Sequence, residues 1–162
     1  MDNEYQNVDI CCPPFEPSAW DDKTHHWNGK KFIKERLFTF LGKPMDFGNV
    51  MADLSKTIEK YKARKVDDMY LMEDVSRWYM DLFLAVDKTI PNMDNVIMSG
   101  EFYTRVYEGN IKQKEKWCEE VQNLLKQQQK TVEKCFAWPT ACPKCAKKYG
   151  KSYVVIIAKI KQ

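Results

Sequence analysis

The feature that most constrains the fold is an alternating stretch in the middle of the chain, residues 69–86. After a polar turn at 73–77, one set of residues alternates with another at period two: Trp78, Met80, Leu82, Leu84 and Val86 with Tyr79, Asp81, Phe83 and Ala85. This alternation is the signature of strands with one buried face. Neither Gly nor Pro interrupts the stretch, which also favours strands. We therefore predict two strands joined by a turn at the centre of the protein.

Glu73 lies at the end of the first of these strands, in phase with Met69 and Leu71. A carboxylate in this position either lies in water at the rim of the sheet or is enclosed among aromatic side chains. An enclosed carboxylate can act as a general acid or base near neutral pH. If it is anionic, it can instead select a cationic ligand, with help from cation–π contacts. The sequence leaves these alternatives open.

The remaining hydrophobic patterns predict further strands and two amphipathic helices. Residues 31–41, 96–107, 132–138 and 153–158 read as strands, and the last is apolar on both faces and therefore expected to be central in its sheet. Apolar side chains at helical spacing predict helices over residues 47–61, with Asp46 as N-cap, and over about 111–130.

The order strand, helix, strand, strand therefore occurs twice. Gly42 and Gly109 end the first strand of each half, and the two halves share hydrophobic phase more than residue identity. We predict an α+β fold of duplicated β-α-β-β units with pseudo-two-fold symmetry. The sheet is expected to be mainly antiparallel, with two helices packed on one face and a groove between the halves.

The chain has 162 residues, which predicts a single domain over 1–162. Residues 1–30 are expected to form an irregular N-terminal arm that packs by its aromatic side chains, because its prolines exclude a helix. The first repeat is expected to span residues 31–90 and the second residues 91–162. A Cys-containing insertion at 139–150 interrupts the second repeat.

Composition excludes several classes of function. The formal net charge of +3 is too small to indicate binding to nucleic acid or to an anionic membrane. No apolar run is long enough for a membrane span, and the acidic N-terminus does not resemble a signal peptide. We therefore expect a cytoplasmic protein with no nucleic-acid or membrane partner. Aromatic residues reach 13%, enough to line a pocket for a flat ligand as well as a core.

Two segments carry a family resemblance. LMEDVSRWYMDLFLAV, which closes the first half, and SGEFYTRVYEGNI, which opens the second, resemble the GyrI-like small-molecule-binding domains of the SOUL/GyrI superfamily. The resemblance covers roughly residues 31–160. It implies an aromatic groove that takes apolar or cationic aromatic compounds, with Glu73 as the acidic residue inside. Some stand-alone members hydrolyse cyclopropane-bearing toxins, and no DNA-binding segment is attached here.

The candidate ligand-binding residues are the aromatic and acidic side chains expected near this groove: Tyr70, Glu73, Trp78, Tyr79, Glu101, Tyr103, Tyr107 and Trp138. Adjacent strand residues point to opposite faces, so at least one of Trp78 and Tyr79 is not a ligand contact. Glu73 and Tyr103 are the candidate catalytic residues if the protein is a hydrolase.

The six cysteines suggest a metal site. The two-residue gap between Cys142 and Cys145 lets both thiolates reach one Zn²⁺, which takes four ligands in structural sites. The remaining ligands are expected from the N-terminal arm, where the candidates are Cys11, Cys12, His25 and His26. Reduced cysteines without metal and a thioredoxin-type redox pair are the alternatives.

The two other cysteines, Cys118 and Cys135, lie in apolar phase. Disulfides are rare in a reducing cytoplasm, so both are expected to be plain core residues.

Three functions compete at this level. The first is a stand-alone protein that binds a small apolar or cationic aromatic molecule. The second is a hydrolase of reactive electrophiles of the cyclopropane type, with Glu73 as general base. The third is a zinc-stabilised interaction module with no small ligand. The natural ligand and the oligomeric state do not follow from the sequence.

Overall fold

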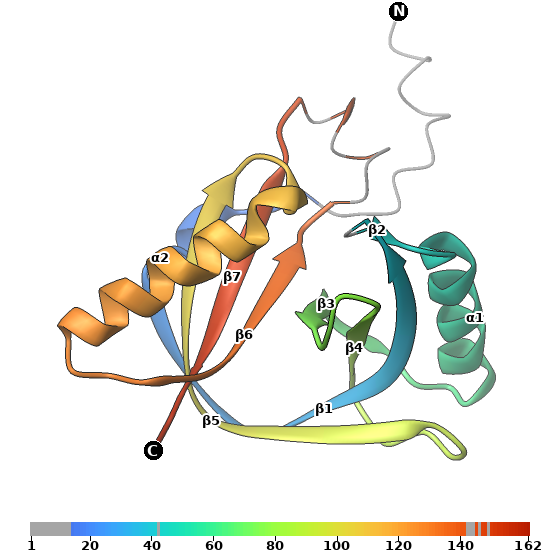
Figure 1. The fold of residues 1–162 in the computed structure, drawn as a ribbon. Helices are drawn as coiled ribbons and strands as arrows, with labels where there is room; N and C mark the ends of the chain where they lie inside the picture. Colours follow the sequence, from blue (N-terminus) through green and yellow to red (C-terminus); the bar gives the residue numbers. More distant parts are fainter. Residues whose placement is uncertain (1–13, 42, 142–144, 146, 149) are drawn as a thin grey trace, which may run out of the picture.

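The computed structural model describes residues 14–41, 43–141, 145, 147–148 and 150–162. Across these residues the strands form one seven-stranded sheet in the order β2-β1-β4-β3-β6-β7-β5, and β5 also pairs with β1. Every pairing between the described strands is antiparallel. The sheet therefore closes on itself into a barrel-like shape with helices outside it (Figure 1). The prediction of an α+β fold with a mainly antiparallel sheet is confirmed.

The elements follow in this order along the described residues: η1 (Pro17–Ala19), β1 (Lys23–Phe40), β2 (Lys43–Pro44), α1 (Phe47–Lys60), β3 (Lys65–Asp74), β4 (Tyr79–Val86), β5 (Asp94–Glu108), η2 (Ile111–Gln113), α2 (Lys114–Gln127), β6 (Val132–Pro139) and β7 (Tyr153–Ile160). The order β-α-β-β is thus present twice, apart from the two-residue β2 and the short 3-10 helices. Internal duplication and two-fold symmetry stay predictions.

The central strand pair forms as the alternation predicts. β3 and β4 pair antiparallel, with Glu73 opposite Asp81, and the polar turn lies between them. β7, apolar on both faces, lies between β6 and β5 and is central. These elements are the ones whose side-chain periodicity is uninterrupted, which is why the sequence identifies them.

β1 is longer than the sequence predicts. Irregular structure is expected up to residue 30, but β1 begins at Lys23 and pairs with β5 from its start. The register shifts between Trp27 and Lys30, where Gly29 takes a φ of +73°. A bulge of this kind moves later side chains to the other phase, so Trp27 and Phe32 pack in the same core cluster despite their odd spacing. The broken phase hides the strand in the sequence.

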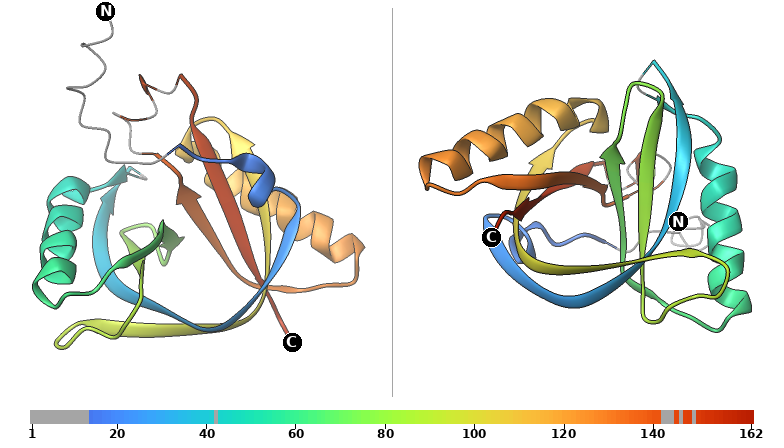
Figure 2. Two further views of the ribbon diagram at one scale, coloured as in Figure 1. Left: turned by 180° about the vertical axis from the view of Figure 1, so that it is seen from behind. Right: turned by 60° about the horizontal axis from the view of Figure 1, so that its bottom comes forward.

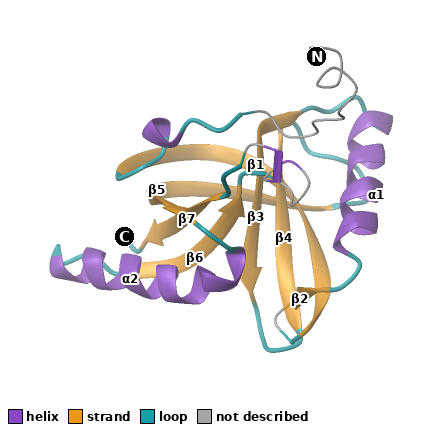
Figure 3. Cartoon of the chain, turned by 90° about the horizontal axis from the view of Figure 1, so that it is seen from above, coloured by secondary structure: helices purple, strands orange, loops and turns teal. Residues whose placement is uncertain are grey.

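The two faces of the closed sheet have different partners. The inner face holds a core cluster drawn from all six long strands, which includes Phe32, Phe83, Phe102 and Phe136. Alternate residues on the outer face of β1, β3 and β4 pack against α1, and those of β5, β6 and β7 pack against α2. Both helices therefore cover the outer face, on different sides of the barrel (Figures 2 and 3).

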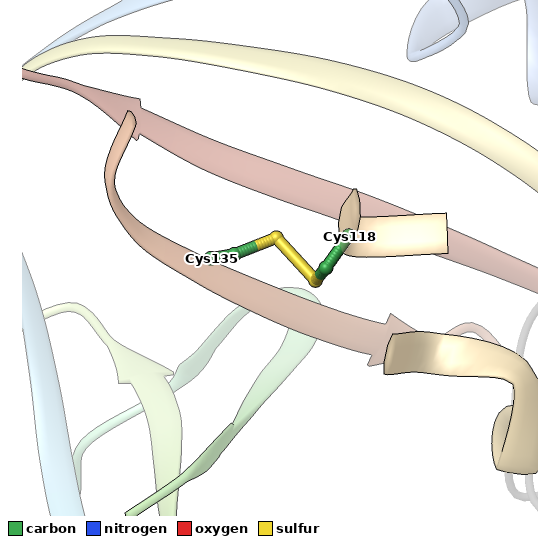
Figure 4. The surroundings of a disulfide bond; sticks show 2 residues. All are labelled: Cys118 and Cys135. Carbon is green, nitrogen blue, oxygen red and sulfur yellow. A yellow bond between two sulfur atoms is a disulfide. The ribbon is translucent and has the colours of Figure 1, made fainter. Parts of the chain in front are cut away.

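Cys118 and Cys135 form a disulfide, contrary to the expectation of two plain core cysteines. The bond joins α2 to β6, with the two Cα atoms 6.2 Å apart (Figure 4). Hydrophobic phase correctly places each side chain at the helix–sheet contact, but it does not reveal that the two sulfur atoms meet. Since such bonds persist mainly in oxidising environments, the cytoplasmic location stays a prediction. In the described part of the chain no helix is long and apolar enough to cross a membrane.

Candidate functional site

The main apolar groove lies on the outer face of the sheet, between the start of α1 and the η2 segment that precedes α2. Its volume is about 540 Å³. Both halves of the chain contribute to its lining, which consists of Pro44, Phe47, Tyr70, Met72, Gly109, Asn110, Ile111, Pro139, Ala141, Ser152 and Val154. A cavity of this size and character is in the range of small-molecule sites, about 300–1,000 Å³.

Strand alternation and one glycine build this groove. Tyr70 and Met72 point to the outer face. Met69 and Leu71, which alternate with them, belong to the inner core. Gly109 has a φ of +147°, and a Cβ there would lie 3.3 Å from the Trp117 ring. Glycine therefore allows the chain to turn closely over Trp117 and enter η2.

The polar groups in the groove lining are few and neutral. They are the Tyr70 hydroxyl, the Asn110 amide and the Ser152 hydroxyl. The Asn110 side-chain oxygen already accepts a hydrogen bond from the backbone N–H of Lys112. The chemistry of the lining thus favours an apolar ligand with a small number of hydrogen-bonding groups.

A carboxylate–ammonium pair lies beside the groove. Asp74 is the next residue in phase after Tyr70 and Met72, and Lys114 donates a hydrogen bond from Nζ to its Oδ1 at 2.7 Å. Both residues line an adjoining hollow of about 600 Å³, which shares Met72 with the groove. Lys114 offsets the charge of Asp74, while Glu115 and Glu119 also line this hollow.

Of the sequence-predicted ligand-binding residues, Tyr70 lines the groove and Glu73 does not. Glu73 belongs to the inner face, with its side chain 18% exposed and its Oε1 3.6 Å from Lys134 Nζ. Its register partner Asp81 is held by the Arg36 guanidinium, with Nε 2.9 Å from Oδ1. Glu73 is thus largely covered and ion-paired, on the face of β3 opposite the groove.

Trp78 and Tyr79 lie in an exposed aromatic cluster away from the groove. Their side chains are about half exposed, and both rings contact Phe38, at centroid distances of 6.2 and 6.1 Å. Trp78 precedes β4 and belongs to the turn, where strand alternation does not apply. The two rings can therefore face the same neighbour.

The predicted residues on β5 are occupied by structural contacts. Tyr103 is buried and donates a hydrogen bond to Asp22 Oδ1 at 2.6 Å. Burial is the largest cause of the raised pKa of Tyr103, and this hydrogen bond is the second. Tyr107 stacks on Trp117 at 4.9 Å, and burial raises its pKa to about 12. Glu101 pairs with Lys130 at 3.3 Å.

The raised pKa values of Tyr103 and Tyr107 predict a loss of stability at alkaline pH. Tyrosines of the unfolded chain ionise near pH 10, while these two hold their protons to higher pH. Their contribution to the free energy of unfolding is therefore full below about pH 10 and lost as the pH rises toward about 12. The free energy of unfolding, measured by urea denaturation between about pH 10 and 12, should fall more steeply for the wild type than for a Tyr103→Phe/Tyr107→Phe variant. Parallel profiles would contradict this prediction.

Trp138 lies in the inner core, 4% exposed, and contacts Phe15 and Trp20 of the N-terminal segment. Adjacent strand residues point to opposite faces of β6. Trp138 therefore points to the inner core, while Pro139 lines the groove on the outer face. Eight predicted residues are therefore spread over both faces of the sheet and an exposed turn.

Three of the predicted zinc ligands, Cys11, Cys12 and Cys142, lie outside the described residues. The fourth, Cys145, is described and buried. Among described residues no group of three or more His, Cys, Asp and Glu side chains is arranged for a metal. His25 has its Nε2 3.0 Å from Thr104 Oγ1 and packs on Trp20. Zinc binding stays a prediction.

Most of the groove-lining residues cannot be recognised from the sequence. Phe47, Met72, Ile111 and Val154 read as ordinary core positions of helices and strands, because a groove between two halves uses the same apolar phases as a core. The available signal was the phase of β3, since Tyr70, Met72 and Asp74 share one face.

Comparison with known proteins identifies a matching family and a similar solved structure. A family model described as "Bacterial hydrolase" matches residues 1–160. The solved structure of SAV2435 bound to tetraphenylphosphonium is similar with a TM-score of 0.46 and 14% sequence identity, over 87% of this chain and 94% of that chain. No curated protein sequence matches the chain.

Proposed function

The chain belongs to the bacterial hydrolase family, and we propose that its outer-face groove binds a small, largely apolar aromatic molecule. The observation that carries this proposal is the groove itself, about 540 Å³ and lined by apolar side chains of both halves. Tyr70, Asn110 and Ser152 supply the hydrogen-bonding groups that orient a ligand. The strands beneath it are held by the inner core, so the groove is largely preformed.

Among the described residues, the groove lining contains no charged side chain, which favours a neutral ligand over a cationic one. Asp74 is the carboxylate in phase with the groove-lining residues of β3, and Lys114 pairs with it at 2.7 Å. A cationic aromatic molecule would have to compete with this ammonium group for the carboxylate.

Two dyes of different charge test this proposal. Neutral Nile red should bind wild-type protein more tightly than cationic rhodamine 6G, measured by fluorescence titration. Lys114→Met leaves Asp74 without its partner and should raise the affinity for rhodamine 6G about fivefold, since a partly exposed ion pair contributes about 1 kcal/mol. The affinity for Nile red should stay the same. Tighter binding of rhodamine 6G by the wild type would contradict the preference for neutral ligands.

A second candidate function is hydrolysis of an electrophile bound in this groove. Two observations favour it: membership of the family and the Asp74–Lys114 pair beside the groove. In this reaction a carboxylate takes a proton from water while the water oxygen bonds to the electrophilic carbon. The bond to the leaving atom breaks with its electron pair, and that atom takes up a proton. The product is heavier than the substrate by one water.

Asp74 and Glu73 are adjacent carboxylates on opposite faces of β3, so replacing each in turn shows on which face such a reaction occurs. The substrates to test are neutral aromatic epoxides and activated aryl cyclopropanes, with product mass as the readout. Asp74→Asn should lower turnover by about a hundred- to ten-thousand-fold if Asp74 is the general base, and Nile red should still bind. Glu73→Gln should leave turnover unchanged. The reverse pattern would identify Glu73 as the base, the acidic residue that the family resemblance implies, and would exclude Asp74.

A further inference from the structure

A second, smaller cavity lies where the N-terminal segment crosses the end of the barrel. Its volume is about 180 Å³, well below the about 300–1,000 Å³ of sites for drug-sized ligands. The lining residues are Pro14, Phe15, Glu16, Ala19, Trp20, Asp67, Asp68, Trp138 and Thr140. The cavity thus combines three aromatic rings with three carboxylates.

The aromatic rings are arranged as walls at right angles. Trp20 is inclined by 85° to Trp138 with centroids 5.0 Å apart, and Phe15 by 81° with centroids 5.7 Å apart. Trp138 is 4% exposed and packed in the inner core, so one wall is fixed by the body of the barrel. Trp20 and Phe15 are half-buried and packed against it.

The charge around these rings is negative on balance. Glu16, Asp67 and Asp68 line the cavity. Lys30 compensates Asp67, with Nζ 3.4 Å from Oδ2, while the Asp67 side chain remains 50% exposed. Glu16 accepts a hydrogen bond from the neutral hydroxyl of Ser18. The ion pair of Lys30 therefore offsets one of three carboxylates.

We propose that this cavity binds a small methylated ammonium group. Aromatic ring faces attract cations within about 6 Å, and cages of several rings with acidic neighbours suit quaternary ammonium groups. A methylated ammonium has few or no N–H donors, so ring walls can enclose it without leaving buried donors unpaired. The small volume selects a single head group.

This site is separate from the outer-face groove. Trp138 and Thr140 line the ammonium cavity, while Pro139 between them lines the groove. The two cavities thus lie on opposite faces of the end of β6, and the ammonium site holds whether or not the groove binds its proposed ligand.

The test is a titration with choline, followed by the indole N–H signals of the tryptophans in NMR spectra. The uncharged isostere 3,3-dimethylbutan-1-ol has the same shape and serves as the matched ligand. Choline should give a saturable shift of the Trp20 and Trp138 signals and bind about tenfold more tightly than the isostere. Equal affinities, or no saturable shift of these two signals, would overturn the proposal.

One carboxylate can be neutralised with little effect on the fold. Asp68 is exposed and has a φ of +46°, a conformation that Asn adopts as readily as Asp. Asp68→Asn should weaken choline binding about three- to tenfold and leave the binding of the isostere unchanged. The control is Asp53→Asn, an exposed carboxylate on α1, which should have no effect. Unchanged choline affinity in Asp68→Asn would overturn the role of charge in this site.

Discussion

Replacing Ser152 with Trp should weaken Nile red binding by at least about tenfold. Ser152 lines the groove and lies just before β7, half-buried at the groove margin. A Trp side chain there can enter the groove from its margin and fill volume that the ligand needs, without having to enter the buried core. Since a tenfold change in affinity corresponds to about 1.4 kcal/mol, the loss of a few ligand contacts is sufficient.

The matched control for this variant is Gln127→Trp. Gln127 is exposed in the last turn of α2, outside the groove lining, and the change adds the same indole to the fluorescence signal. Gln127→Trp should bind Nile red as the wild type does, and both variants should keep the wild-type melting temperature within a few degrees. Unchanged dye binding by Ser152→Trp would exclude the groove as the site.

Removing the disulfide should produce the largest loss of stability. Cys118 and Cys135 are 17 residues apart in sequence, and closing a loop of this length stabilises a fold by about 3 kcal/mol through the entropy of the unfolded chain. Cys118→Ala should therefore lower the free energy of unfolding by about 2–3 kcal/mol in non-reducing buffer. Urea denaturation with and without dithiothreitol measures this difference.

The control for this prediction is that the stability losses of the two single cysteine variants do not add in the double variant. Cys135→Ala and the double variant should each be about as unstable as Cys118→Ala, because all three lack the same bond. Dithiothreitol should bring the wild type close to the variants. A wild type whose stability does not depend on dithiothreitol, or the absence of a peptide cross-linked through Cys118 and Cys135 in mass spectra, would contradict the bond.

Much of the fold follows from periodicity in the sequence. The strand pair β3–β4, the two amphipathic helices and the central position of β7 are predicted because their patterns are unbroken over several residues. The first half of β1 is not predicted, because the bulge near Gly29 shifts the phase. The β1–β5 pairing that closes the sheet uses Lys23–Trp27 as well as Lys30–Lys34, and strand periodicity does not specify which strands pair with each other.

The candidate site is harder to predict than the fold, for a different physical reason. Period two assigns Glu73 to the same face as Met69 and Leu71, and the structure bears out this phase. The sequence does not say which face carries the groove, since both faces of β3 are apolar. The pattern identifies Tyr70 as a groove residue by its aromatic ring, but it does not distinguish Met72 and Asp74 from ordinary strand positions.

Disulfide and ion-pair partners likewise cannot be predicted from the pattern around a single residue. Cys118 and Cys135 each look like core residues, and Asp74 looks like the polar end of a strand. Their partners are brought to them by α2 packing on the outer face, which joins residues far apart in sequence. Trp20 and Trp138 meet in the same way across the end of the barrel.

The most direct test of the central claim, that the outer-face groove binds a neutral apolar molecule, is photolabelling with benzophenone. Benzophenone is neutral and aromatic, and its excited state inserts into C–H bonds, those of methionine above all. Met72 is the methionine that lines the groove, while Met45 is about half exposed on the surface. Peptide mapping should find the main adduct on Met72, and excess Nile red should suppress it. Adducts spread over exposed methionines such as Met45, with Met72 unlabelled or its labelling unaffected by Nile red, would contradict the claim.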